Sequence, residues 1–195
     1  MAAEHATTRP RPGRPAQLNR ERIVDAALSH GNLETLTMRD LAAHLGVSHS
    51  ALYRWVANRD ELVDLVNEVI IERVVPEEAR LAGSGWQGGL AAIAWAMHDQ
   101  FLAVPGFATR ISRPHRHTAH AFGRLHDAII SAFMNDGVDA AMAEQSWYIY
   151  ITTVVSWLAV QENPLDLGAT APRFELFLDA LLRGLPAREP GIGRG

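Results

Sequence analysis

Residues 46–62, GVSHSALYRWVANRDEL, concentrate side chains that can form hydrogen bonds within a very short span. Their hydroxyl, imidazole and guanidinium groups suit contacts with an anionic or hydrogen-bonding partner. The set consists of Ser48, His49, Ser50, Tyr53 and Arg54. The chain shows no convergent nucleophile, carboxylate pair or glycine-rich phosphate loop, so these residues point to binding, and we do not expect an enzyme.

A second polar cluster, RPHRHTAHAFGRLH at residues 113–126, holds four histidines: His115, His117, His120 and His126. Imidazoles gathered in this way can bind a metal ion or orient a ligand. Their spacing matches no common metal-ligand motif, and the only nearby carboxylate is that of Asp127. Metal binding, ligand binding and a plain polar loop therefore stay open for this segment, and we assign no metal and no cofactor to the chain.

Helix start and stop signals define the elements that hold the first set of residues. One helical pattern begins after Asn19, and a second, LTMRDLAAHLG, has a cap at Thr37 and a stop at Gly46. A short third helix follows after two or three residues, and a fourth begins after Asn58 and runs to about Pro76. A helix, a tight glycine turn and a short helix form the helix-turn-helix pattern.

The third helix has the size and the side chains needed to enter the major groove of DNA. An α-helix fits this groove, and a helix-turn-helix presents the N-terminal part of its second helix there. Val47, Leu52 and Val56 would hold one face to the protein, which leaves the polar face for bases and phosphates. We therefore predict double-stranded DNA as a partner; a surface helix with incidental polar residues is the alternative.

The segment IVDAALSHGNLETLTMRDLAAHLGVSHSALYRWVANRDELVDLV resembles the DNA-binding domain of the tetracycline-repressor (TetR) family of bacterial regulators. The shared pattern is a first helix with paired alanines, then T-x-R-x-L-A-x-x-L-G-V-S, then L-Y-x-x-V-x-N followed by a cation. The resemblance covers roughly a quarter of the chain. At the cation position the family commonly has lysine, whereas this chain has Arg59.

The resemblance implies separate roles in positioning the protein on DNA and in reading bases. Thr37, Tyr53 and Arg59 match phosphate-contacting positions, and Arg39 matches a helix residue that reaches the groove. Base-reading positions are occupied by His49, Ser50, Ala51, Arg54 and Trp55, and Ser48 is a further candidate for contact with bases or phosphates. Trp55 stands among them, and both packing inside the domain and DNA contact stay open for it.

The charges of the chain suggest a further DNA contact at its N-terminus. Residues 1–60 contain eight arginines and six acidic residues, whereas residues 61–195 contain ten arginines and sixteen acidic residues. The arm RPRPGRPAQLNR resembles an AT-hook, which inserts arginines into a narrow, A·T-rich minor groove. Arg11 and Arg14 are therefore candidate DNA contacts, and a simple solubilising tail is the alternative.

The remainder of the chain also predicts helices, over residues 86–102, 118–135, 140–161 and 173–183. We expect a flexible joint at residues 83–89 and an all-α fold, in which a three-helix DNA-binding domain precedes a larger helical domain. The predicted divisions are a disordered basic arm (1–17), the helix-turn-helix domain (18–66), an effector-binding and dimerisation domain (67–186) and a disordered tail (187–195).

The resemblance implies that the larger domain holds a pocket for a small apolar or aromatic effector. The candidate lining residues are His98, Phe101, Phe107, Arg110, Ile111, Phe122 and Trp147. In the family, helices that correspond to residues 140–161 and 173–183 form a dimer interface. A two-fold dimer would place two recognition helices about 34 Å apart on a palindromic operator.

The predicted function is a ligand-responsive regulator of the TetR type, a repressor that a small-molecule effector releases from DNA. A helix-turn-helix protein whose larger domain only dimerises is the alternative. The chain has no cysteine and no apolar leader, and its longest apolar stretch is about half the ~20 residues that a membrane span needs. We therefore expect a cytoplasmic homodimer without a membrane partner; the effector, the operator and the sign of regulation stay open.

Overall fold

The computed structural model describes residues 18–33, 35–75, 85–113, 119–166, 168 and 171–188. Within these ranges every regular element is a helix, which confirms the predicted all-α fold. The helices are α1 (Arg20–Ser29), α2 (Met38–Leu45), α3 (His49–Leu52), α4 (Arg59–Val74), α6 (Gly85–Leu102), α7 (Phe107–Ile111), α8 (Ala119–Asn135), α9 (Ala140–Glu162) and α10 (Phe174–Gly184). The predicted arm, with Arg11 and Arg14, and residues 189–195 of the predicted tail lie outside the described residues.

The first four helices begin at caps that the sequence predicts or allows. The side chains of Asn19, Thr37 and Asn58 each accept a hydrogen bond from a backbone N–H three residues further on. Gly46 ends α2 with a φ of 66°, a left-handed conformation that side chains with a Cβ rarely adopt. These local signals fix the angle between α2 and α3, so the helix-turn-helix is determined largely by short-range interactions.

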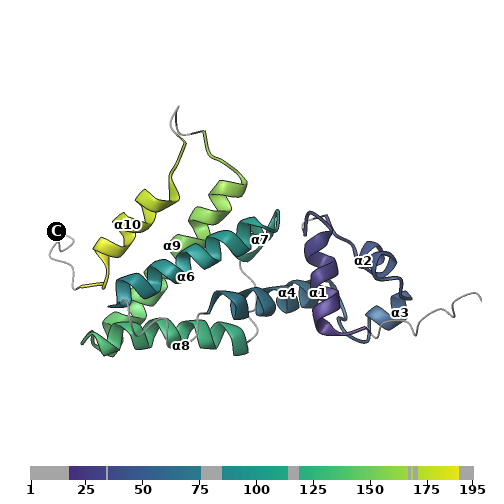
Figure 1. The fold of residues 1–195 in the computed structure, drawn as a ribbon, viewed down its shortest axis with the longest axis horizontal. Helices are drawn as coiled ribbons and strands as arrows, with labels where there is room; N and C mark the ends of the chain where they lie inside the picture. The colour runs from purple at the N-terminus through teal and green to yellow at the C-terminus, as the bar shows by residue number, and fades with distance from the viewer. Residues whose placement is uncertain are drawn as a thin grey trace, which may run out of the picture.

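Figure 1 shows an elongated molecule with α1, α2 and α3 at one end and α6 to α10 at the other. Helix α4 runs between the two groups and packs against α1, α6 and α8. The boundary that we predict between residues 66 and 67 falls inside this helix, and the domain limits stay a prediction.

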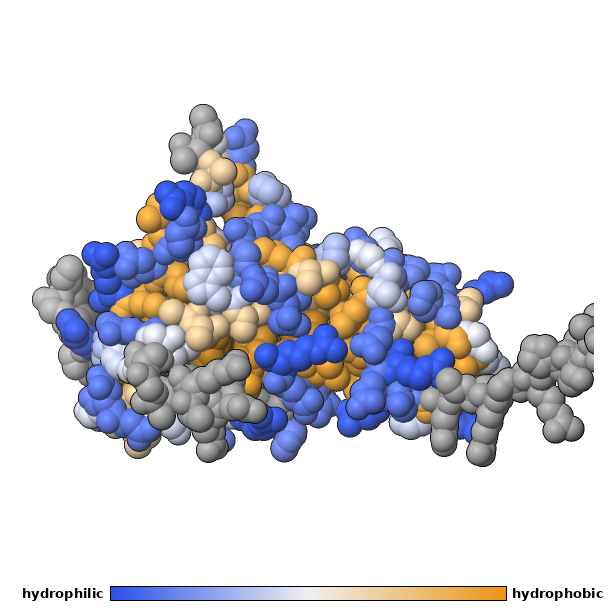
Figure 2. All heavy atoms as spheres, viewed as in Figure 1, coloured by the Kyte–Doolittle hydropathy of each residue, from blue (hydrophilic) through white to orange (hydrophobic). Residues whose placement is uncertain are grey.

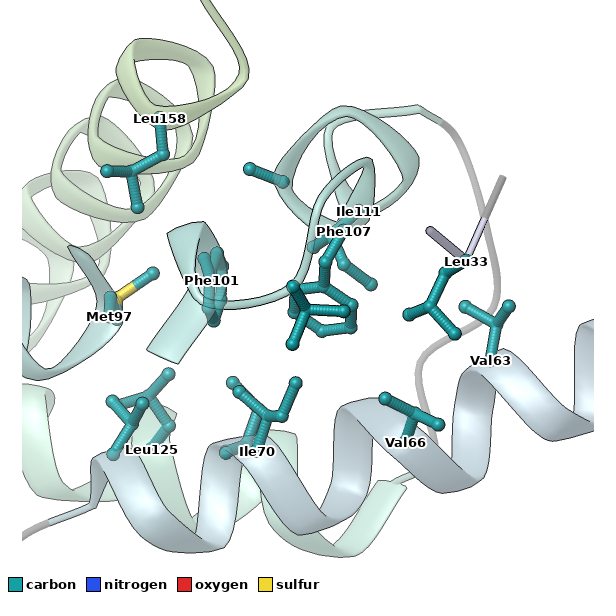
Figure 3. Close-up of a cluster of buried hydrophobic side chains, with 14 of the residues drawn as sticks. Leu33, Val63, Val66, Ile70, Met97, Phe101, Phe107, Ile111, Leu125 and Leu158 are labelled. Carbon is teal, nitrogen blue, oxygen red and sulfur yellow. The ribbon is translucent and has the colours of Figure 1, made fainter. Parts of the chain in front are cut away.

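Buried apolar side chains form one continuous cluster along α4. Figure 3 shows Leu33, from the loop after α1, and Val63 and Val66 of α4 close to Phe107, which in turn lies beside Phe101 of α6. All five side chains are at most 3% exposed. The two groups of helices therefore share one core in the part of the chain that the structure describes.

The predicted flexible joint at residues 83–89 is wrong for residues 85–89, which form the first turn and a half of α6. The Trp86 ring packs 5.2 Å from the Phe133 ring of α8, and Gly89 and Leu90 are buried. Each glycine in a helix costs about 1 kcal/mol relative to alanine. Burial of these neighbouring side chains outweighs that cost, which the local sequence does not reveal.

Helices α9 and α10 leave apolar side chains on the surface. Tyr148, Ile149 and Leu176 are 65%, 40% and 57% exposed. In contrast, Phe174 and Leu178 are buried within the chain, and Phe177 stacks on Trp157 at 4.3 Å. Figure 2 shows hydrophobic residues among hydrophilic ones on one face of the molecule. None of the described helices is both long enough and apolar enough to cross a membrane.

Candidate functional site

Helix α3 is anchored on one side and solvent-exposed on the other. Leu52 and Val56 are at most 2% exposed and belong to the apolar core, and α3 packs against α2. The Ser48 hydroxyl accepts a hydrogen bond from the Ala51 N–H at 3.2 Å and so caps the helix. Its oxygen also lies 3.1 Å from the hydroxyl oxygen of Ser50. The N-terminal end of α3 is thus both rigid and accessible.

The exposed face of α3 carries the residues that we expect to read bases. His49, Ser50 and Arg54 are exposed, and Ala51 is partly exposed. Tyr53 is 44% exposed, and its ring meets that of His49 edge-on at 5.2 Å.

Trp55 adjoins this face, and 46% of the residue is exposed. An indole of this exposure is only partly held by the domain, so packing and DNA contact stay open for Trp55.

Two of the three expected phosphate-contacting residues, Thr37 and Arg59, lie at the starts of α2 and α4, and the third, Tyr53, follows α3. Thr37 and Arg39 are exposed. The Thr37 hydroxyl donates to Oδ2 of Asp40 at 2.5 Å, and this hydrogen bond lowers the pKa of the Asp40 carboxyl. Arg59 donates from Nη2 to the carbonyl oxygen of Leu33 at 2.6 Å. Arg59 therefore holds the loop between α1 and α2, a role that the sequence does not indicate.

A cavity of about 290 Å³ lies in the larger group of helices. Residues of α4, α6, α8 and α9 surround it, together with the end of α7, and aromatic rings form much of its wall. The lining residues are Asn67, Ile71, Met97, Phe101, Ile111, Ser112, Phe122, Leu125, Trp147, Tyr148, Ile151, Thr152, Val155 and Ser156. Helix α4 therefore forms a wall of the cavity, and through Asn58 and Arg59 its start adjoins the group of helices α1 to α3.

Four of the seven expected ligand-binding residues line this cavity: Phe101, Ile111, Phe122 and Trp147. The other three lie elsewhere. His98 packs against the Phe174 ring of α10 at 4.8 Å, and Phe107 is buried edge-on against Phe101 at 4.9 Å. Arg110 pairs with Asp60 through a 2.5 Å contact between Nη2 and Oδ1. Helical spacing predicted the right elements, but the direction of each side chain depends on how the helices pack.

The sequence analysis missed the residues that α4 and the middle of α9 contribute to the wall. For α4 a signal was present: Asn67 is a polar residue in a face otherwise formed by Val63, Val66, Ile70 and Ile71. An asparagine in such a face needs a partner or a function. For α9, the lining positions Tyr148, Thr152 and Ser156 carry no comparable signal, because partly polar faces are common on surface helices.

Helix α7 connects the cavity with the group of helices α1 to α3. Besides the pair of Arg110 with Asp60, the Leu33 N–H donates to the Pro105 carbonyl oxygen at 3.3 Å. The Glu162 carboxylate fixes α7 to the end of α9, since it accepts hydrogen bonds from the Ala108 and Thr109 N–H groups. A shift of α7 therefore changes contacts on both sides.

The histidine cluster is only partly described. His115 and His117 lie outside the described residues, and His120 is exposed on α8. His126 lies 3.0 Å from Asp127 and 3.2 Å from Glu144, and its ring meets that of Trp147 edge-on at 5.3 Å. No group of three or more metal-ligating side chains occurs in the part of the chain that the structure describes.

Partial burial lowers the pKa of His126, but the hydrogen bonds to Asp127 and Glu144 outweigh this effect and raise it above its ordinary value. A raised pKa in the folded state stabilises the protein at pH below about 6.5, the pKa in the unfolded chain. This stabilisation disappears as the pH rises through the folded-state value. His126 thus links α8 to α9 most strongly in mild acid.

We predict that His126→Gln lowers the melting temperature more at pH 6 than at pH 8, because only the protonated imidazole pairs with both carboxylates. Thermal unfolding at a series of pH values measures this difference. His120→Gln, on the same helix but exposed, is the matched control and should show no such trend. An equal loss at both pH values would contradict the assignment.

No family model matches the chain. It is 37% identical over 89 residues to the HTH-type transcriptional repressor DrrR1 of Streptomyces coeruleorubidus, which covers 44% of this chain and 33% of the relative. It is 38% identical over 78 residues to the class D tetracycline repressor protein of Escherichia coli, which covers 38% of this chain and 36% of the relative. The matches therefore span about a third of the length of these relatives.

The fold is also similar to that of a solved TetR variant from Acinetobacter baumannii AYE in complex with minocycline. The two structures superpose with a TM-score of 0.71 and 25% sequence identity over 86% of this chain and 96% of the other. The likeness to a solved structure thus extends over the larger helical domain, beyond the segment that matches the curated relatives.

Proposed function

We propose that this chain, like the TetR-type repressors and solved TetR structures to which it is similar, is a ligand-responsive repressor. It binds a palindromic operator as a homodimer in the cytoplasm and is released by a small-molecule effector. The observation that carries the proposal is the position of α4, which begins next to the DNA-facing helices and forms a wall of the cavity.

DNA binding is supported by the anchored and exposed faces of α3. Ser48, His49, Ser50, Ala51 and Arg54 read bases in the major groove, while Thr37, Arg39, Tyr53 and Arg59 position the protein on the backbone, and Arg11 and Arg14 reach the minor groove. An arginine that pairs with guanine through two hydrogen bonds contributes about 1–3 kcal/mol of base discrimination. This sequence information comes mainly from Arg54, since the other reading side chains are short or form single contacts.

Dimerisation is supported by the exposed apolar side chains on α9 and α10, among them Ile149 and Leu176. Two-fold symmetry brings the same patch of both chains together, and it relates two copies of α3. Copies about 34 Å apart match successive turns of the major groove. A palindromic operator follows from that symmetry.

Release follows from a two-state shift. An effector in the cavity touches α4 directly and, through Ile111, reaches α7, whose Arg110 pairs with Asp60 at the start of α4. An effector that binds more tightly to one arrangement of these helices favours that arrangement. The spacing of the two α3 helices then no longer fits the operator, and the effector and the operator weaken each other's binding by the same factor.

A ligand-independent DNA-binding protein is the second candidate, since the exposed faces of α9 and α10 would serve dimerisation alone. The cavity favours the ligand-responsive protein, because a domain that only dimerises needs no internal space. Selection of bound DNA from a random pool, followed by competition with candidate effectors, separates the two: effector-resistant binding would support the second candidate.

We predict that Arg54→Ala lowers affinity for the selected operator by about 10- to 100-fold and relaxes the preference at one base pair in each half-site. Competition binding to operators with single base changes measures both effects. Arg124→Ala, an exposed arginine on α8, is the charge-matched control and should leave affinity and preference unchanged. Equal losses on all DNA sequences would mean that Arg54 contacts only the backbone.

We predict that deletion of residues 1–15 weakens operator binding and flattens its dependence on salt. Each phosphate that an arginine neutralises contributes about 0.9 to the slope of log affinity against log salt. Fluorescence anisotropy between about 50 and 200 mM salt measures the slope. If affinity and slope are both unchanged, the arm is only a tail.

A further inference from the structure

One residue of the cavity wall, Asn67, has a buried side-chain oxygen to which the described part of the protein offers no partner. Asn67 is 2% exposed, and no described residue forms a hydrogen bond with its Oδ1. More than about nine in ten buried polar atoms in proteins have a partner. An exception that lines a cavity is therefore a sign that the partner comes with a ligand.

The position of Asn67 on α4 strengthens this interpretation. Val63, Val66, Ile70 and Ile71, on the same side of the helix, are all buried apolar residues. An apolar residue of similar size at position 67 would pack without any unsatisfied oxygen. Packing against these neighbours therefore gives no reason for an amide at position 67.

The serine and threonine hydroxyls of the wall are hydrogen-bonded or exposed. Thr152 donates its hydroxyl to the Tyr148 carbonyl at 2.6 Å, and Ser112 donates to the Thr109 carbonyl at 2.9 Å. Ser156 is exposed. Consequently Asn67 is the only buried residue among the asparagine, serine and threonine residues that line the cavity in the described part of the chain.

None of the described residues that line the cavity carries a charge. An ionised ligand would give up its hydration here without a counter-charge in exchange, which strongly disfavours binding. The rings of Phe101, Phe122, Trp147 and Tyr148, in contrast, offer flat apolar surfaces. The volume of about 290 Å³ lies at the lower end of the range for small-molecule pockets.

We propose that the effector is an uncharged, compact aromatic molecule whose hydroxyl or N–H group donates a hydrogen bond to Oδ1 of Asn67. The inference rests on the proposed function and specifies the chemistry of the same site. It makes Asn67 the residue that determines specificity, because a ligand without a donor leaves the amide oxygen unsatisfied. The contact falls on α4, so the group that selects the ligand also belongs to the helix that reaches the DNA-facing end.

Three naphthalene probes test this chemistry on the full chain at pH 7: 2-naphthol, which is neutral and donates; 2-methoxynaphthalene, which is neutral and cannot donate; and 2-naphthoate, which is ionised. Their dissociation constants are measured by calorimetry or by the change in tryptophan fluorescence, since Trp147 lines the cavity. We expect 2-naphthol to bind about tenfold more tightly than the methoxy compound, and the naphthoate to bind weakest.

Asn67→Leu, which keeps the number and branching of the heavy atoms in the side chain, should bring the two neutral probes to within about threefold of each other. It should also raise the melting temperature of the ligand-free protein, because it removes the unsatisfied oxygen. Thr152→Val is the matched control, since its hydroxyl already bonds within α9, and it should keep the preference for 2-naphthol. A preference that survives Asn67→Leu would overturn the proposal.

The order of the probes on the unaltered protein decides the question even if Asn67→Leu does not fold. Equal or tighter binding of 2-naphthoate, or no binding of either neutral probe, would overturn the proposed chemistry. Failure of the proposed function looks different. If the proposed function is wrong, 2-naphthol binds with the expected selectivity but leaves operator affinity unchanged. If only the proposed ligand chemistry is wrong, a charged effector releases the protein from DNA.

Discussion

Burial of the apolar side of α4 is the interaction on which the rest of the structure depends. Val63 and Val66 lie on the side of Leu33, and Ile70 lies on the side of Phe101 and Leu125 in the larger bundle. Because interiors are densely packed, one side of a helix cannot move without displacing its neighbours. A change at the cavity wall is thus transmitted along a single rigid element, and no flexible linker interrupts it between residues 59 and 74.

Two polar contacts also fix the start of α4 to its neighbours. Arg59 ties the start of α4 to the loop after α1 through the Leu33 carbonyl, and Asp60, the next residue, pairs with Arg110 of α7. Asp60 is exposed, so water screens the pair and its own contribution to stability is at most about 1 kcal/mol. Its importance lies in geometry: it joins the end of α7, beside the cavity, to the first turn of α4.

The sequence predicted the boundaries of α2 and α4 well because the signals that fix them are local. Caps at Thr37 and Asn58 and the left-handed Gly46 act over a few residues, so they can be identified without knowledge of the tertiary fold. The cavity depends on how distant helices pack, and periodicity does not reveal which of the buried residues line it. Phe101 and Phe107 illustrate this, since both are buried aromatics and only Phe101 lines the cavity.

The central claim, that both groups of helices share one core, is tested most directly by fluorine NMR of protein labelled with 5-fluorotryptophan. Trp55 reports on the DNA-facing end and Trp147 on the cavity. In a urea titration, a shared core predicts that both resonances change from folded to unfolded at the same midpoint. If the Trp55 resonance changes at a clearly lower urea concentration, the DNA-facing helices unfold independently, and α4 does not couple them to the cavity as we describe.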